Sequence, residues 1–129
     1  MIQRTDTNAD DAQVRKFRKE LNSGLSALVV LSILAKAGGE MYGYQIAKEL
    51  SAGDDDTLPF KQGALYPVLR QLHASGFLTS RVEVSVSGPP RRYYTITDTG
   101  RDTLKQWIAA YREVRTFVDN AIGQDEAHA

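Results

Sequence analysis

The sequence predicts a mainly α fold of the α+β type, in which three helices precede a two-stranded hairpin and one long helix follows it. Three observations predict this order. Apolar residues recur at helical spacing before Gly76, two β-rich runs flank Gly88-Pro89-Pro90, and a long apolar stripe begins after Asp98. A chain of 129 residues, 42% hydrophobic and 25% charged, is typical of one soluble globular domain.

The first helix is predicted from the density of apolar residues. Residues 1–13 are polar and aperiodic, so we expect a flexible N-terminal arm there and a folded domain over 14–97. From about Leu21 or Ser23 to Ala37 the apolar residues are too dense for a one-sided stripe, and Gly38-Gly39 supplies a helix stop. This segment is predicted to be the central core helix.

The next two helices follow from helical spacing. Ile46, Ala47 and Leu50 share one face of a short helix over 44–50, and residues 51–59 form a loop. A third helix is expected from about Lys61 to Ser75, with a kink at Pro67. Its apolar face consists of Leu65, Val68, Leu69 and Leu72.

A hairpin and a last helix complete the domain. The strands are expected over 77–85 and 91–97, on either side of the proline-rich turn. Asp98 is a plausible N-cap for a helix over 98–122, although Gly100 weakens its first turn, and residues 123–129 are expected to be a flexible tail. The stripe of this helix is formed by Leu104, Trp107, Ile108, Tyr111, Val114, Val118, Ala121 and Ile122.

Three compact helices followed by a ribbon form the winged helix-turn-helix arrangement, for which we expect double-stranded DNA as the partner. In this arrangement the third helix can enter the major groove, and the wing can reach a flanking groove or the backbone. We favour core packing for Tyr44 and Tyr94 and a phosphate contact for Tyr66. The candidate DNA-binding residues are Tyr42, Lys61, Gln62, Tyr66, Arg70, Arg91 and Arg92.

The distribution of charge permits a basic face on a chain whose net charge is zero. Nucleic-acid binders often carry a basic excess, so neutrality counts against this function. Residues 57–101, however, contain six basic and two acidic residues, a local excess of four positive charges. The acidic residues collect in 6–11, 54–56 and the tail.

Three linked motifs resemble the PadR-like family of transcriptional regulators. They are Tyr42-Gly43-Tyr44-Gln45-Ile46, the run from Gly63 to Leu72 (GALYPVLRQL), and the run from Gly88 to Thr97 (GPPRRYYTIT) through Gly100. The resemblance covers about residues 21–122. One departure is His73, where the family commonly has glutamate.

The resemblance implies a dimeric repressor, often of stress, detoxification or efflux genes, which a small molecule releases from DNA in some members. The chain stops soon after its last helix, so it resembles the short subfamily with a single C-terminal dimerisation helix over 98–122. The expected interface of the homodimer is formed by Leu104, Ile108, Tyr111, Val114, Val118 and Ile122.

Trp107 and Tyr111 lie on one face of the last helix and have two interpretations. Both can belong to the core of the dimer. By resemblance to short family members that bind flat aromatic drugs between paired domains, they can also form an effector site for a planar aromatic or phenolic compound.

The sequence offers no catalytic arrangement, so we expect a regulator and no enzyme, cofactor or metal site. His73 and His128 lie far apart without a cysteine partner, and His73 is interpreted as a surface residue. The longest apolar stretch, 25–37, is shorter than the ~20 residues of a membrane span, and no secretory signal precedes it. We therefore expect a cytoplasmic protein with no membrane partner. The alternative functions are a winged-helix protein-interaction module without DNA binding and, less favoured, a ligand carrier.

Overall fold

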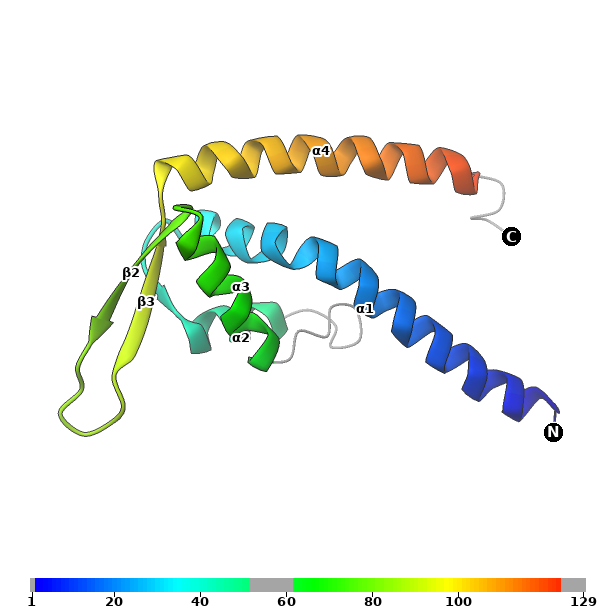
Figure 1. Cartoon of the computed structure of the whole chain (residues 1–129), viewed down its shortest axis with the longest axis horizontal. Coiled ribbons are helices and arrows are strands. Elements are labelled where there is room, and N and C mark those ends of the chain that lie inside the picture. The colour runs from blue at the N-terminus through cyan, green and yellow to red at the C-terminus, as the bar shows by residue number, and fades with distance from the viewer. Residues whose placement is uncertain (1, 52–61, 124–129) are drawn as a thin grey trace.

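The structure, a computed structural model, describes the backbone of residues 2–51 and 62–123. It confirms the predicted helices and hairpin and adds one short strand (Figure 1). The elements in chain order are α1 (Ile2–Ala37), β1 (Met41–Tyr42), α2 (Gly43–Ser51), α3 (Gln62–Ala74), β2 (Leu78–Glu83), β3 (Arg91–Ile96) and α4 (Asp98–Ile122).

The sheet has three antiparallel strands in the order β1-β3-β2. We predicted a two-stranded hairpin, which β2 and β3 form with a register from Leu78↔Ile96 to Glu83↔Arg91. β1 adds to the free edge of β3 through Met41↔Tyr94 and Tyr42↔Tyr93. A strand of two residues is too short to show the alternation by which strands are recognised in a sequence.

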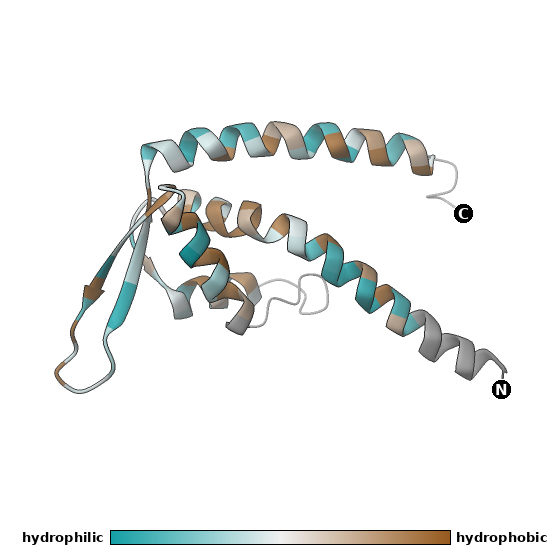
Figure 2. Ribbon diagram, viewed as in Figure 1, coloured by the Kyte–Doolittle hydropathy of each residue, from teal (hydrophilic) through white to brown (hydrophobic). Residues whose placement is uncertain are grey.

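The core lies where the C-terminal half of α1 meets α2, α3, the sheet and the start of α4. Figure 2 shows hydrophobic residues concentrated in this half of α1. The side chains that are 7% exposed or less are Val30, Leu31, Leu34, Ile46, Leu65, Leu69, Leu72, Leu78, Tyr94, Ile96 and Leu104. Leu104 was predicted for the dimer interface; it is instead enclosed by its own chain, because it lies in the first two turns of α4, directly above the sheet and α1.

α1 begins at Ile2, well before the predicted start at Leu21 or Ser23, and it includes most of the segment that we assigned to an arm. Residues 12–22 are rich in alanine, glutamine, lysine, arginine, glutamate and leucine, which extend a helix without forming a dense apolar run. Part of this helix, Asp11–Ala37, is long and apolar enough to cross a membrane by length and composition. Core helices of soluble proteins pass the same test, and Val30, Leu31 and Leu34 are fully buried in the core.

Thr97, and not the predicted Asp98, is the N-cap of α4. Its hydroxyl oxygen accepts a hydrogen bond from the Gly100 N–H at 2.9 Å, and the hydroxyl donates to the Gly76 carbonyl at 2.8 Å. One side chain thus satisfies a free amide of the helix and ties α4 to the turn between α3 and β2. α3 runs from Gln62 to Ala74 with Pro67 inside it.

Candidate nucleic-acid interface

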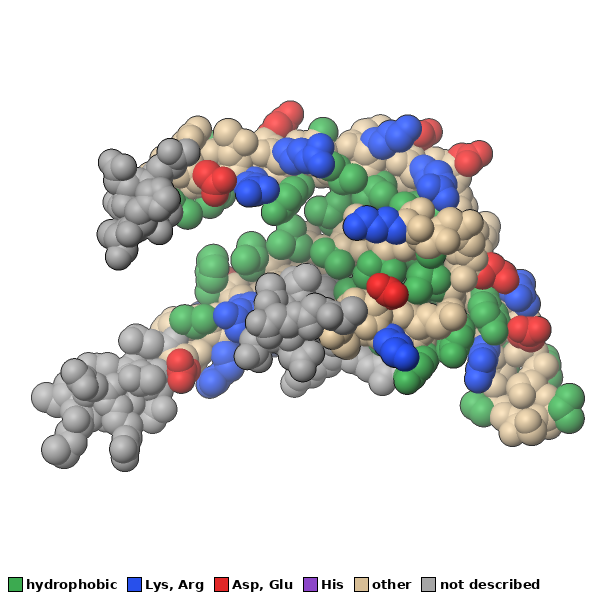
Figure 3. All heavy atoms as spheres, turned by 180° about the vertical axis from the view of Figure 1, so that it is seen from behind, with side chains coloured by type: hydrophobic (Ala, Val, Ile, Leu, Met, Phe, Trp, Pro, Cys, Tyr) green, Lys and Arg blue, Asp and Glu red, His purple; other side chains and the backbone are tan. Residues whose placement is uncertain are grey.

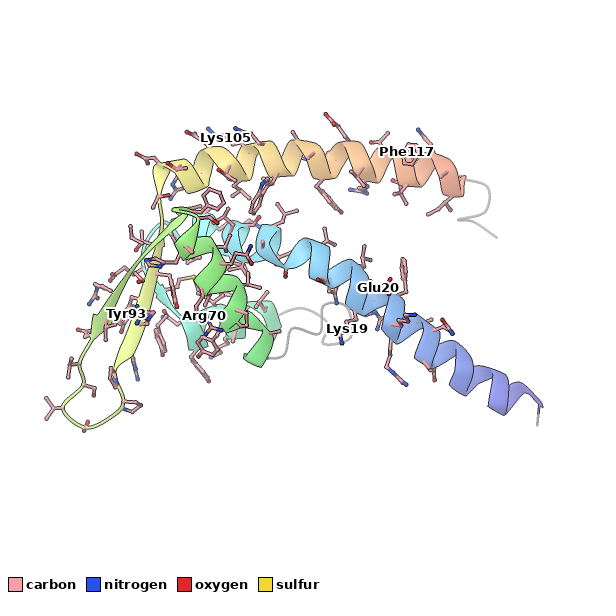
Figure 4. All side chains as sticks on the ribbon, in the orientation of Figure 1. Lys19, Glu20, Arg70, Tyr93, Lys105 and Phe117 are labelled. Carbon is pink, nitrogen blue, oxygen red and sulfur yellow. The ribbon has the colours of Figure 1, made fainter. Side chains whose placement is uncertain are left out.

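α3 has a buried face and an exposed face, as predicted. Leu65, Leu69 and Leu72 are enclosed by the core. Tyr66, Arg70 and Gln71 are exposed. The outer surface of the helix therefore carries one guanidinium, which can contact a phosphate, and two other side chains that can form hydrogen bonds. Figure 4 marks Arg70 on this helix and Tyr93 on the ribbon.

Tyr66 fixes the contact between α2 and α3. A Cβ atom on the buried Gly43 would lie 3.0 Å from the Tyr66 Cε1 and hydroxyl oxygen, so glycine lets this ring pack on the first turn of α2. The Tyr66 side chain remains 40% exposed. It therefore holds the two helices together while keeping part of its surface available to a ligand.

Tyr42 lies at the centre of an aromatic cluster between β1, α2 and the ribbon. Its ring stacks on Tyr44 at a centroid distance of 6.2 Å and meets Tyr93 edge-on at 5.5 Å. Its N–H donates to the Gln45 Oε1 at 3.0 Å. The predicted core position of Tyr44 is wrong, because this side chain is 58% exposed; Tyr94, at 4%, is in the core as predicted.

Arg91 and Arg92 point to opposite faces of the ribbon, because successive residues of a strand alternate. The Arg91 guanidinium lies over the Tyr42 ring, with Cζ 4.7 Å from its centroid. Arg92 donates from Nη1 to the Ser80 hydroxyl at 3.2 Å, on the face that carries Tyr94. We expected both arginines at a proline-stiffened turn. They instead open strand β3, where each has its own partner.

The face of the ribbon that carries Arg92 meets the exposed side of α3. The Ser80 Oγ lies 3.4 Å from the His73 Nε2 of α3. Burial raises the pKa of the Tyr94 hydroxyl, and the positive charges of Arg92 and Arg70 act in the opposite direction. Arg70 of α3 and Arg92 of the ribbon therefore approach the same tyrosine from two elements.

A salt bridge between Glu40 and Arg81 joins the segment before β1 to the far strand β2. The Arg81 Nη2 donates to Oε1 at 2.8 Å, its Nε donates to Oε2, and its Cζ lies 4.6 Å from the Tyr93 ring centroid. The hydrogen bond lowers the pKa of the Glu40 carboxyl and raises the pKa of Arg81. We did not predict this pair, whose members are 41 residues apart. It neutralises one of the basic residues that we counted toward the basic face.

Lys61 and Gln62 are the remaining candidate residues for DNA binding. Lys61 falls outside the described residues, so its role in DNA binding stays a prediction. Gln62 is the first residue of α3, and its backbone lies at the helix end from which a major groove is usually read.

Trp107 and Tyr111 line one groove between α4 and α1. Its volume is about 380 Å³, and its lining is mostly apolar: Gly24, Leu25, Ala27, Leu28, Trp107, Ala110, Tyr111 and Val114. Trp107 is half-buried and packs edge-on against Phe77 at a centroid distance of 5.7 Å. The structure thus brings the two predicted effector residues together.

The outer half of α4 carries an exposed apolar face. Val114, Val118 and Ile122 are 60%, 43% and 50% exposed, and Phe117, which we did not predict, is 74% exposed. α1 diverges from α4 and carries its own exposed apolar residues, Val14, Phe17 and Leu21. Figure 3 shows hydrophobic side chains along the facing sides of the two helices.

The family of the chain follows from comparison with known proteins. A model of the transcriptional regulator PadR-like family matches residues 30–106, more than half of the chain. A transcriptional regulator from Mycobacterium tuberculosis is 38% identical over 89 residues, 68% of this chain and 79% of that protein. The negative transcriptional regulator PadR of Bacillus subtilis is 28% identical over 85 residues, 66% of this chain and 46% of that protein.

Solved structures agree with this assignment. The crystal structure of a PadR family transcriptional regulator from Eggerthella lenta superimposes with a TM-score of 0.77 at 31% identity, covering 90% of this chain and 97% of that chain. Bacillus subtilis PadR in complex with operator DNA superimposes with a TM-score of 0.58 at 28% identity, covering 65% of this chain and 46% of that chain. The fold, the family model and these relatives show that the chain belongs to the PadR-like family of transcriptional regulators, which are not enzymes.

Proposed function

We propose that the chain is a dimeric, sequence-specific repressor that binds operator DNA through α3 and the ribbon and is released by a planar aromatic compound. The observation that carries the proposal is the set of exposed side chains that α3 and the ribbon present: Tyr66, Arg70 and Gln71 on α3, Arg92 on the ribbon face toward α3, and Arg91 on the opposite face. It has the guanidinium and amide groups that read phosphates and base edges. The similarity to a protein crystallised with operator DNA supports the same use of the fold.

In this proposal α3 and the ribbon contact different parts of the DNA. α3 has the dimensions and the exposed face to enter a major groove, with Gln62 and Arg70 as candidates for base or backbone contact. The ribbon carries Arg91 on one face and Arg92 on the other, so two arginines reach phosphates on different sides of the wing. A cytoplasmic location fits this function.

The dimer is proposed to form through α4 together with the first half of α1. A second copy related by a two-fold axis would bury Phe117 and Val118 against Phe17 and Leu21. Monomers rarely leave apolar patches of this kind in water. We expect two copies of the chain to pair there because α1 and α4 expose apolar residues along the sides that face each other.

The groove beside Trp107 and Tyr111 is the proposed effector site. Its volume falls in the range of small-molecule pockets, and it combines apolar walls with the indole N–H and the phenol hydroxyl. It adjoins the proposed dimer interface, so a ligand there contacts the helices that set the spacing of the two DNA-binding units.

A salt series tests DNA binding against the rival function, a protein-interaction module. We expect the logarithm of the affinity for the chain's own upstream DNA to fall linearly with the logarithm of the salt concentration, as measured by fluorescence anisotropy. Arg91→Ala and Arg92→Ala should each weaken binding to all sequences and reduce the slope by about 0.9 for every phosphate that the variant no longer neutralises. If the protein shows no saturable DNA binding at low salt, DNA binding is ruled out and the protein-interaction module is favoured.

A further inference from the structure

His73, Ser80 and Arg92 meet at the junction of α3 with the two ribbon strands. The Ser80 hydroxyl receives a hydrogen bond from Arg92 at 3.2 Å and lies 3.4 Å from the imidazole Nε2 of His73. We name these three residues the junction cluster. They come from three elements and lie on the face of the ribbon that the proposed DNA surface includes.

The hydrogen-bonding capacity of the cluster depends on the charge of His73. A hydroxyl has one proton and two lone pairs, and the Arg92 N–H occupies one lone pair. When His73 is neutral, its Nε2 can accept the hydroxyl proton. When His73 is protonated, its Nε2–H must donate to the second lone pair, and the hydroxyl proton becomes free to donate to an outside acceptor. The protonated cluster then presents only donors.

The cluster carries positive charge, and no carboxylate of the described residues forms a salt bridge with it. Within residues 11–51 and 64–123, the salt bridges join Arg81 to Glu40 and Glu83 and join Arg115 to Asp119, so none includes His73 or Arg92. Tyr94 pairs with Ser80 across the ribbon, and Arg92, Tyr66 and Arg70 all act on the Tyr94 hydroxyl. Arg81 and Glu83 of β2 lie on the opposite face of the ribbon, as their register with Tyr93 and Arg91 requires.

We propose that the junction cluster binds one phosphate of the DNA backbone and that His73 takes up a proton when it does. The proposal rests on the proposed DNA-binding function and deepens it. A phosphate bound between the His73 and Arg92 side chains places a negative charge beside the imidazole, and this charge favours the imidazolium.

Proton uptake makes DNA affinity depend on pH. By linkage, affinity rises as pH falls when DNA binding takes up a proton, with a limit of about tenfold per pH unit for each protomer that takes up one proton. The chain has only two histidines, His73 and His128, and the phosphodiesters of DNA do not titrate in this range. A pH dependence between 6 and 8 can therefore be assigned by single substitutions.

The test is the affinity of the full-length protein for its upstream DNA from pH 6 to pH 8 at constant ionic strength. We expect the wild type to bind more tightly at pH 6 and His73→Gln, which keeps a polar side chain but cannot titrate, to show the same affinity at both values. Arg91→Ala, on the opposite face, should weaken binding at both values and keep the pH dependence, as His128→Gln should. Circular dichroism verifies that each variant is folded.

The outcomes separate this proposal from the proposed function. Saturable, salt-dependent binding that does not change with pH, or a pH dependence that survives in His73→Gln, would overturn the proton-coupled site and leave DNA binding intact. Failure to bind at any pH would overturn both. NMR of the imidazole gives an independent measurement: we expect the His73 ring to be protonated on addition of DNA at pH 7, and an unchanged ring would overturn the proposal.

Discussion

At the scale of single residues, Gly100 leaves the least room for a side chain among the glycines that the structure describes. A Cβ atom there would lie 2.3 Å from the Phe77 carbonyl oxygen and 2.9 Å from the Ile96 Cγ1. The first contact is with backbone, so no rotamer change can relieve it. We therefore expect Gly100→Ala to lower the free energy of unfolding by about 1–3 kcal/mol in urea denaturation, as overpacking does.

Gly39→Ala is the matched control for this substitution. No atom lies within 4 Å of a Cβ at Gly39, so the same change should shift the free energy of unfolding by no more than about 0.5 kcal/mol. Equal effects at the two positions would show that the close approach at Gly100 does not govern stability.

Residue-level features were only partly predictable, because many depend on partners that are distant in sequence. Gly100 was noted as a weak helix former, but its contact with Phe77 arises only when α4 folds over the sheet. Arg91 and Arg92, which we predicted as DNA contacts, are exposed, and their separation onto two faces follows from where β3 begins. Nothing in the sequence pairs Glu40 with Arg81, since their contact requires β1 to join the ribbon.

At the scale of elements, the pattern of apolar residues located the helices and the hairpin well. α4 was predicted over 98–122 and has these bounds, because its stripe is long and regular. The start of α1 was placed about 20 residues too late, because helix propensity without an apolar stripe leaves little periodic signal. β1 is stabilised by pairing with β3 and has no local signal of its own.

The apolar outer half of α4 leads to a prediction about assembly. We expect Val118→Asp combined with Phe117→Asp to yield monomers in analytical ultracentrifugation, because carboxylates at a buried interface lose their hydration without gaining a partner. These residues suit the test better than Ile108, which packs partly against the core of its own chain.

The control places the same charge elsewhere on the helix. Thr116 is exposed and, two residues before Val118, faces the opposite side of α4, so Thr116→Asp should leave the dimer intact. A dimer that persists in the Phe117 and Val118 variant would place the interface elsewhere.

At the scale of the whole molecule, the ribbon lies at one end and the α1 and α4 arms diverge toward the other, as Figure 1 shows. The proposed effector groove is lined by residues of α1 and α4. A ligand in this groove is expected to quench the fluorescence of Trp107, the only tryptophan of the chain. Aromatic stacking contributes about 0.5–1.5 kcal/mol per pair beyond burial, so Tyr111→Ala should weaken the binding of planar compounds.

Release from DNA requires more than binding. The ligand must favour the arrangement of the dimer that does not fit the operator, because equal affinity for both arrangements shifts nothing. We expect planar dyes or phenolic acids to quench Trp107 more readily in the free dimer than in the DNA-bound dimer. Quenching with equal affinities would establish a pocket without a switch, and the absence of quenching by every compound would favour a purely structural role for both aromatics.

The most direct test of the central claim, that a dimer reads DNA through two copies of α3 and the ribbon, is a hydroxyl-radical footprint on the chain's own upstream DNA. Two-fold symmetry predicts two protected half-sites whose centres are separated by about 34 Å, one helical turn, or a multiple of it. Arg70→Ala should weaken both half-sites together, since each α3 carries one copy of the residue. The account would be contradicted by a single protected patch or by protection spread evenly over any sequence. It would also be contradicted by the absence of protection at every protein concentration tested.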